Sequence, residues 1–543
     1  MAARLPYECL ELILNNIPKD DISTLHSALL VNRSWCSIVV NILWKYPFTV
    51  SADLPSHYKI ISVLYECLSD EARASTKLDI PSEKQRHTFS YPCLIKELDF
   101  KKLYDLSLTW RCDVEEARIR AWYQLDVKER MKSKVLQVLE CGLDDAENYR
   151  RLRLRNRTSD NDWESDDERS AGTSTEMKIV LLTVELCKLI VSHAEISNLK
   201  ITTRGLPRVW SLDYDGHLAV STYPGAQKCF AKLREFTCHG VFLKDKLVLP
   251  LSTISQNITK IDIGDQHVST IIELEKFIRS QRSLQHFMFH GNYCDLSSVV
   301  QALGVHKNTL KHLEINSGYF RSRHAFAGLS ECHNLETLRL KQCYLPDYHL
   351  KPLAEGELRN LRCIELEDIP DVWSDIDDDE EDFDPPIEQF KRLMSSIGAQ
   401  LEEVRIPVDL YYYPGLVRAT AAHCSNLRVF AANIKTDEHV DELLELLRSC
   451  DRLEELSLER LDLSKWEIPY EVMDEILKRF PDGLQYLAWH SYDFSRNPDK
   501  VRNKYADMLQ SKGFIVKSLK ADSQREGSRW ARPIYKIAVE FEK

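Results

Sequence analysis

Apolar residues in the second half of the chain follow one recurring pattern, Leu-x-x-Leu-x-Leu, in which other apolar residues often replace Leu. Its copies begin at Leu233, Ile258, Leu284, Leu310, Leu335, Leu361, Leu401, Leu427, Leu453 and Leu484. Successive copies start 25, 26, 26, 25, 26, 40, 26, 26 and 31 residues apart. Alternating apolar and polar positions predict short strands with one buried face. The steady period predicts a solenoid of similar units, because one unit cannot bury its apolar face alone.

Amphipathic stretches follow many of these strands and predict helices. They lie at 270–280, 297–304, 389–398, 441–450 and 470–480. The one long interval, between Leu361 and Leu401, contains an acidic segment at 371–386 that we interpret as a loop inserted between a strand and its helix. Two apolar runs near the C-terminus, 515–519 and 534–542, predict closing strands that cap the array.

The first 48 residues predict three short helices. Pro6 suits the first turn of a helix, apolar residues from Leu10 to Ile17 follow at helical spacing, and Pro18 ends that helix. Asp21 or Ser23 is expected to cap a second helix, which runs through Leu25, Ala28, Leu29 and Asn32. A third apolar run covers 38–44.

The region between these helices and the array is less regular. Residues 57–73 and 135–143 are predicted to be helical, 95–100 and 196–201 to be early strands, and 180–194 to be a buried helix. The domain prediction is therefore a helical unit at 1–48, a linker with early irregular units at 49–154, an acidic disordered insertion at 155–177, the solenoid at 178–520 and a C-terminal cap at 521–543.

Composition narrows the function. The chain has 543 residues and a formal charge of −12, which argues against a general nucleic-acid binder and favours, if anything, basic partners. Fifteen scattered cysteines without a C-x-x-C pair indicate reduced thiols, and no apolar run reaches membrane-spanning length. We expect a soluble protein of the cytoplasm, the nucleus or both, with no nucleic-acid or membrane partner.

Catalytic signatures are missing from the sequence. It contains no H-E-x-x-H, P-loop, G-x-S-x-G or strand-associated G-x-G-x-x-G motif. His286 and His290 are four residues apart on a predicted strand, roughly 13 Å, which is too far for one ion. His286 and His312 are expected to be lateral neighbours, but no third ligand is evident. We predict a protein that is not an enzyme and uses no cofactor or metal.

The N-terminal helices carry three ordered elements that resemble an F-box. They are Leu5-Pro6-x-Glu8-x-Leu10 with Ile13-Leu14, then Val31-Asn32-x-x-Trp35, then Leu43-Trp44. The array resembles the leucine-rich repeats of F-box/leucine-rich-repeat proteins of the cysteine-containing type, with Cys343 and Asn292 at the position of the repeat Cys or Asn. Its irregularity and acidic insertions resemble fungal members of that family.

This resemblance implies the fold class and a function. The fold would be α/β, with a three-helix F-box followed by an irregular leucine-rich-repeat solenoid, a horseshoe of parallel strands with outer helices. The F-box would dock a Skp-type adaptor, and through it a cullin, while the repeats hold an unidentified protein target for ubiquitination. The implied adaptor-binding residues are Leu5, Pro6, Glu8, Leu10, Ile13, Leu14, Val31, Asn32, Trp35, Leu43 and Trp44. The alternative is a repeat scaffold or regulatory binding protein that acts outside a cullin ligase.

A physical argument supports an N-terminal docking role independently of the resemblance. A unit of about 45 residues carries more apolar side chains here than it can bury on itself, so some are expected to face a partner. An ordinary helical cap for the array remains the simpler alternative.

The polar positions of the predicted strands would form the exposed face of the sheet. The residues four positions after the start of each repeat should lie side by side on adjacent strands. Glu314, Arg339 and Glu365 are three such neighbours. Two interpretations stay open, a surface ion ladder and a charged recognition strip. For the second, we take Met288, His290, Arg339 and Lys341 as candidate target contacts. The acidic loop likewise is either a solvated loop or an attractor for a basic target.

Overall fold

The computed structural model describes most of the helices and strands. The described residues are 5–18, 21–48, 59–78, 88–124, 169–202, 219–240, 245–264, 271–343, 347–367, 387–406, 415–433, 437–459, 478, 484–492, 506–507, 509–510, 516–524 and 534–541. The acidic loop at 371–386 and the predicted helices at 135–143 and 470–480 lie outside them, apart from residue 478. The chain divides into two compact units, Met1–Gln266 and His267–Lys543, and this division falls inside the predicted array.

Three helices open the first unit. They are α1 (Tyr7–Asn15), α2 (Ile22–Leu29) and α3 (Arg33–Lys45). Asp21 caps α2, since its carboxylate accepts a hydrogen bond from the Thr24 N–H. Asn32 is not part of the second helix as predicted. It caps α3 instead, accepting from the Trp35 N–H at 3.0 Å, because an Asn side chain satisfies a free N–H at a helix start better than it serves a helix interior.

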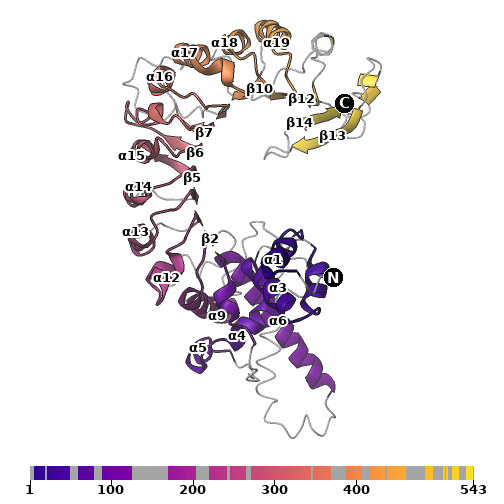
Figure 1. The fold of residues 1–543 in the computed structure, drawn as a ribbon. Coiled ribbons are helices and arrows are strands. Elements are labelled where there is room, and N and C mark those ends of the chain that lie inside the picture. Colours follow the sequence, from indigo (N-terminus) through magenta and orange to yellow (C-terminus); the bar gives the residue numbers. More distant parts are fainter. Residues whose placement is uncertain are drawn as a thin grey trace. The chain divides into compact units, whose positions relative to one another are not determined.

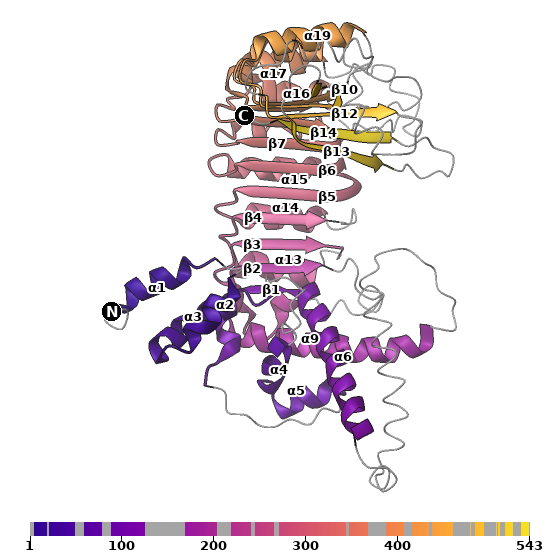
Figure 2. The same cartoon turned by 90° about the vertical axis from the view of Figure 1, so that its right-hand side faces the viewer.

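The rest of the first unit contributes four parallel strands in the order β1-β2-β3-β4 (Figure 2). Its strands are β1 (Glu97–Asp99), β2 (Asn198–Thr202), β3 (Glu235–His239) and β4 (Lys260–Gly264). Its further helices are α4 (Lys59–Glu66), α5 (Asp70–Ser75), η2 (Tyr91–Leu94), α6 (Phe100–Gln124), α9 (Arg169–His193), η4 (Val220–Thr222), α12 (Ala226–Phe230) and α13 (Asp245–Ile254). The early strands predicted at 95–100 and 196–201 are therefore present as β1 and β2.

Helix α9 corrects the predicted disordered insertion at its C-terminal end. Residues 169–177 belong to this helix, although they carry little apolar content. From Ile179 onward the helix buries apolar side chains. Extending an existing helix by further residues is easy compared with starting one, and no proline interrupts 169–177, so the helix continues outward from its buried part. The remainder of the predicted insertion, 155–168, lies outside the described residues.

The second unit repeats strand and helix, and Figure 1 shows α14 to α19 along one side of its strands. The parallel strands are β5 (His286–Asp295), β6 (His312–Tyr319), β7 (Thr337–Cys343), β8 (Cys363–Glu367), β9 (Glu403–Ile406), β10 (Val429–Asn433), β11 (Glu455–Glu459) and β12 (Tyr486–Tyr492). The helices are α14 (Ile271–Ser280), α15 (Ser297–Leu303), η6 (Gly304–His306), η7 (Leu329–Glu331), α16 (Asp347–Glu355), α17 (Ile387–Ile397), η9 (Gly398–Gln400), α18 (Leu416–His423) and α19 (Asp437–Ser449). Four of the five predicted helices are thus confirmed.

A hairpin closes the second unit. Strand β14 (Ile534–Phe541) pairs antiparallel with β12, and β13 (Val516–Gln524) pairs with β14 at the end of the order. The two predicted closing strands are present, but the predicted boundary at 521 falls within β13. The cap therefore begins about five residues earlier, because both strands of a hairpin must belong to the same paired element.

Strand register places the repeating apolar residues in the core. In β7 the burial alternates, so that Leu338 and Leu340 are buried while Thr337, Arg339 and Lys341 are half-exposed. The flanking leucines Leu335, Leu310 and Leu361 are fully buried as well. The apolar half of the pattern therefore holds the strands to their helices, and the polar half forms the opposite face of the sheet.

Amide side chains at the position before four of the repeat starts tie neighbouring units together. Asn334 donates to the carbonyl oxygen of Asn308 at 2.7 Å, and Asn360 donates to that of His333 at 2.8 Å. The Asn426 side chain donates in the same way to the Ala399 carbonyl oxygen. Gln400 occupies the corresponding position in its repeat and donates to the Leu358 carbonyl oxygen. These four amides, which we call the amide rungs, satisfy turn carbonyls at the edge of the sheet where the strands begin.

Candidate protein-binding surfaces

The three N-terminal helices share a small hydrophobic core. It is made of Leu10, Leu14, Leu25, Ala28, Ile38 and Val39, with Ile17, Leu29, Trp35, Ile42 and Leu43 packed partly against it. Leu10 and Leu14, both expected to face a partner, therefore lie inside this core. A core of this size is marginal for independent stability, so exposure of any further apolar side chain needs an explanation.

Much apolar surface nevertheless remains outside that core. Of the eight large apolar side chains that are exposed among the described residues, six lie between positions 5 and 31. They are Leu5, Tyr7, Leu12, Ile13, Leu30 and Val31, with exposed fractions from 44% for Leu5 to 88% for Leu30. We call these six residues the N-terminal apolar patch. Such a concentration is typical of a surface that binds another protein.

The patch agrees in part with the residues inferred from sequence. Leu5, Ile13 and Val31 belong to it, and Pro6 and Glu8 stand at the start of α1 beside it. Tyr7, Leu12 and Leu30 were missed. Leu30 follows the last residue of α2, and the apolar pair it makes with Val31 outside any helix was the available signal.

The last inferred docking residues turn toward their own chain. Trp35 and Leu43 pack partly on the helical core. The centroid of the Trp44 ring lies 4.4 Å from that of the Tyr91 ring in η2. The Lys96 N–H donates to the Lys45 carbonyl oxygen at 2.9 Å. Trp44 therefore helps join α3 to the segment that leads into β1, and it is only partly available to a partner.

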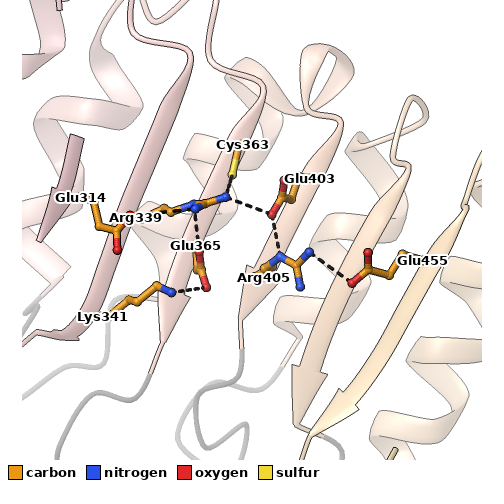
Figure 3. A network of polar contacts seen from close by, with 8 residues as sticks. All are labelled: Glu314, Arg339, Lys341, Cys363, Glu365, Glu403, Arg405 and Glu455. Atoms are coloured by element: carbon orange, nitrogen blue, oxygen red, sulfur yellow. Dashed lines mark hydrogen bonds and ion pairs between the residues drawn. The ribbon is translucent and has the colours of Figure 1, made fainter. Parts of the chain in front are cut away.

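A network of charged side chains crosses the polar face of the second unit (Figure 3). Its centre is Arg339 on β7, whose Nε lies 3.0 Å from Oε2 of Glu365 on β8. Its guanidinium also lies within 3.9 Å of Glu314 on β6 and 3.7 Å of Glu403 on β9. Lys341 contacts the other oxygen of Glu365 at 3.1 Å. The Glu365 carboxylate thus pairs with two cations at once, and its side chain is only 9% exposed.

The network continues through Arg405. Its Nε lies 2.6 Å from Oε1 of Glu403, and its Nη2 lies 3.2 Å from Oε1 of Glu455 on β11. Burial opposes the charge on Arg405, but these carboxylates prevail and raise its pKa. Together with Lys341, the two arginines meet four glutamates, so the strip carries little net charge and its cations already have partners.

The register of this strip is the one predicted from sequence. Glu314 pairs with Arg339, Arg339 with Glu365, and Glu365 with Arg405 across adjacent parallel strands. Met288 of β5 pairs with Glu314, and His290 with Asn316, so the four candidate target contacts do share one face. Arg339 and Lys341 are both held in ion pairs with Glu365; the pair with Arg339 belongs to the predicted ion ladder, whereas the contact of Lys341 with the same carboxylate was not predicted.

Cysteine and histidine side chains also lie on this face. Burial raises the pKa of the Cys363 thiol to about 12, so it stays protonated at neutral pH. The rings of His286 and His312 stack with centroids 4.3 Å apart, which confirms the lateral neighbours predicted. Within the described parts of the chain, no group of three or more His, Cys, Asp or Glu side chains is arranged to hold a metal ion.

The strands of the first unit also carry two deeply buried carboxylates, Glu97 and Asp99. Lys200 on β2 donates to Oε1 of Glu97 on β1 at 2.6 Å. Asp99, only 8% exposed, accepts from the Lys102 N–H at 3.0 Å at the start of α6. Burial raises the pKa of Asp99, although the Lys102 hydrogen bond and the charges of Lys102 and Lys200 oppose that change.

We expect Asp99→Asn to stabilise the fold at neutral pH. A folded-state pKa above the unfolded value means that ionised Asp99 costs stability at high pH and that this cost disappears as pH falls through the folded pKa. Asparagine keeps the Oδ1 acceptor and removes the charge, so the free energy of unfolding should rise by roughly 0.5–2 kcal/mol at pH 7.5. Denaturant unfolding at decreasing pH should show the advantage shrinking; a variant less stable at pH 7.5 would mean that Lys200 needs the carboxylate.

Comparison with known families finds a match at the N-terminal helices. The F-box domain model matches residues 3–45, which covers α1 to α3 and the whole apolar patch. This match supports an F-box protein and suggests an adaptor role in an SCF-type ubiquitin ligase, since F-box domains typically bind Skp-type adaptors. A search of curated proteins found no match to the chain.

Among the described helices, none has the length and apolar content needed to cross a membrane.

Proposed function

We propose that this protein is the substrate-recognition subunit of an SCF-type ubiquitin ligase, whose N-terminal helices dock a Skp-type adaptor. The observation that supports it most is the coincidence of the F-box match at 3–45 with the apolar patch of the same helices. Burying one such side chain at an interface contributes roughly 1.5–3 kcal/mol before the costs of association. Three or four patch residues together would contribute roughly 4.5–12 kcal/mol before those costs.

We propose that the rest of the chain is an irregular leucine-rich-repeat solenoid that holds the protein target. The 25- and 26-residue period, the parallel strands in chain order and the helices along one side of the second unit favour this assignment. Cys343 supports it as well, since its buried thiol lies 3.2 Å from the Lys341 carbonyl oxygen and 3.6 Å from that of Ile315, at the end of a repeat strand. The fungal-like character stays a prediction.

The polar face of the second unit is our candidate for target contacts. Met288 and His290 are half-exposed there and lie beside the charged strip. A target that uses Arg339 or Lys341 must compete with Glu365 for them, so we expect their contribution to come from exchange of ion pairs rather than from free charges. In this role the protein has no catalytic step and acts within the cell, where adaptor and cullin are present.

Affinity purification of the full chain from cells tests the proposal. We expect a Skp-type adaptor and a cullin to co-purify in comparable amounts, and target proteins to accumulate when ubiquitin-dependent degradation is blocked. Recovery of the adaptor without a cullin would instead favour a scaffold or regulatory binding protein outside a cullin ligase. Recovery of neither would remove the ligase proposal.

A further inference from the structure

The connection between β6 and β7 differs from its neighbours in the second unit. Strands β5, β7 and β8 are each followed by a helix, whereas β6 is followed by a loop and the short η7. Two buried aromatic side chains of this loop, Phe320 and Phe326, meet with ring centroids 4.8 Å apart. The ring of His349 in α16 is fully buried, and its centroid lies 5.7 Å from the centroid of each of these two rings. The loop is therefore packed against the unit in place of a helix.

Ser322 fixes the middle of this loop through each of its polar groups. Its N–H donates to Oγ of Ser297 at 3.0 Å, and its own Oγ accepts from Nε2 of Gln301 at 3.2 Å. Its carbonyl oxygen lies 3.1 Å from Nε2 of His349. Because a carbonyl only accepts, Nε2 carries the proton, and burial lowers the pKa of His349 to about 4, so the neutral ring is the stable donor.

Basic side chains flank this anchored residue on both sides. Arg321, Arg323 and His324 are exposed, and we call them the basic ledge. The guanidinium carbon of Arg321 lies 5.5 Å from the ring centroid of Tyr319, and its backbone N–H donates to Oδ1 of Asp295 at 3.3 Å. Three cationic or titratable groups thus lie within four positions of one exposed loop.

We propose that the basic ledge binds an acidic segment of a partner protein, one that carries several closely spaced aspartates or glutamates. Exposed loops that bind a partner work best when other side chains hold them in place, and here β5, α15 and α16 supply that support. Stacking on Tyr319 limits the freedom of the Arg321 guanidinium, so less entropy is lost when it binds a carboxylate. Planar guanidinium groups pair with carboxylates through two parallel hydrogen bonds.

The net negative charge of the chain opposes a nucleic acid more strongly than a short acidic segment, because a nucleic acid carries a phosphate charge at every nucleotide. A nucleic-acid site needs a basic stripe on a chain whose field attracts phosphates, and a formal charge of −12 repels them at long range. A short acidic segment needs only the local complementarity of the ledge. This proposal goes beyond adaptor docking and does not depend on it, because every residue involved lies in the second unit.

Fluorescence anisotropy with defined peptides tests the ledge on the purified full chain. The probe is a labelled decapeptide in which glutamate alternates with serine, and its partner peptide carries glutamine in place of glutamate. We expect the glutamate peptide alone to bind, with affinity that falls as salt rises. The variant Arg321→Glu/Arg323→Glu should lose about tenfold or more, because like charges then face each other. The matched control Arg282→Glu/Arg392→Glu changes two other exposed arginines by the same charge and should keep the affinity.

Several outcomes overturn the proposal. Equal losses in the ledge variant and the control would mean that only the total charge matters. Binding of the glutamine peptide, or no binding of the glutamate peptide, would remove the acidic partner. A phosphoserine peptide that binds where the glutamate peptide fails would replace the carboxylate assignment.

The anchoring of the loop has its own test. Ser297→Ala removes the acceptor for the Ser322 N–H and leaves both arginines in place. We expect affinity for the glutamate peptide to fall about threefold while the circular dichroism spectrum and the melting midpoint stay close to those of the unaltered chain. An unchanged affinity would show that the loop need not be held by Ser297, and would overturn the claim that the ledge is preorganised.

Discussion

Replacing Ile13 and Leu30 by aspartate is expected to abolish adaptor binding while the three N-terminal helices stay folded. Both side chains belong to the N-terminal apolar patch and neither contributes to the helical core. Each loses roughly 1.5–3 kcal/mol of burial at the interface and adds a charge that must be desolvated there. Because each 1.4 kcal/mol is about tenfold in affinity, we expect a loss of about a hundredfold or more. Biolayer interferometry with purified Skp-type adaptor gives the measurement.

A control variant separates docking from general surface effects. Ile272 on α14 is 60% exposed, similar to Ile13 at 50%, but it lies outside the F-box match. Ile272→Asp should leave adaptor affinity unchanged. If the double variant at Ile13 and Leu30 still binds the adaptor with native affinity, the apolar patch is not the docking surface and the proposed function loses its main support.

Leu14→Ala is expected to unfold the N-terminal helices and to abolish adaptor binding for a different reason. Leu14 is 1% exposed and lies in the helical core between α1 and its neighbours. Leucine-to-alanine changes at such sites cost about 2–5 kcal/mol, which a core of six buried residues cannot absorb. Hydrogen exchange followed by mass spectrometry should show loss of amide protection across residues 7–45, with protection of the second unit preserved.

The matched change on the same helix is Leu12→Ala. Leu12 is 67% exposed, so its truncation should alter the free energy of unfolding by less than about 0.5 kcal/mol and leave amide protection in place. Protection that survives in the Leu14 variant would show that the helices are held by something other than their own core. This pair of variants therefore distinguishes residues that build the unit from residues that face the adaptor.

Strand register was predictable from sequence because it depends on a local rule. Side chains alternate between the two faces of a strand, so a leucine at every second position fixes which residues lie on the polar face. The pairing of Glu314, Arg339 and Glu365 follows directly from that rule. The closing strands β13 and β14 were found in the same way, from short apolar runs near the C-terminus.

Features that depend on distant contacts were not predictable. Helix α6 and the early start of α9 contain polar stretches, and the hydrophobic periodicity of both helices is weak. The anchoring of Ser322 depends on Ser297, Gln301 and His349, which lie 21 to 27 residues away and carry no shared motif. Local patterns give no signal for such contacts, because any polar residue in a loop is equally compatible with solvent.

At the N-terminal helices, too, the local pattern was predictable and the packing was not. The ordered elements around Leu5, Val31 and Trp35 identified the right helices, and the family match covers them. Burial decided which members face outward, and the sequence did not separate Leu14 in the core from Ile13 on the surface. In a helix, adjacent positions point in different directions, and a short helix with apolar residues on several sides leaves the inward face undetermined.

The amide rungs have a consequence for how the chain tolerates changes in length. Between Leu361 and Leu401 the interval grows to 40 residues, yet Cys363 still pairs with Glu403, and Gln400 still reaches the Leu358 carbonyl oxygen. The amide rungs lie where strands begin, so residues added after a strand ends do not disturb them. Insertions there are structurally inexpensive, and new surface segments can be acquired on that border without realigning the stack.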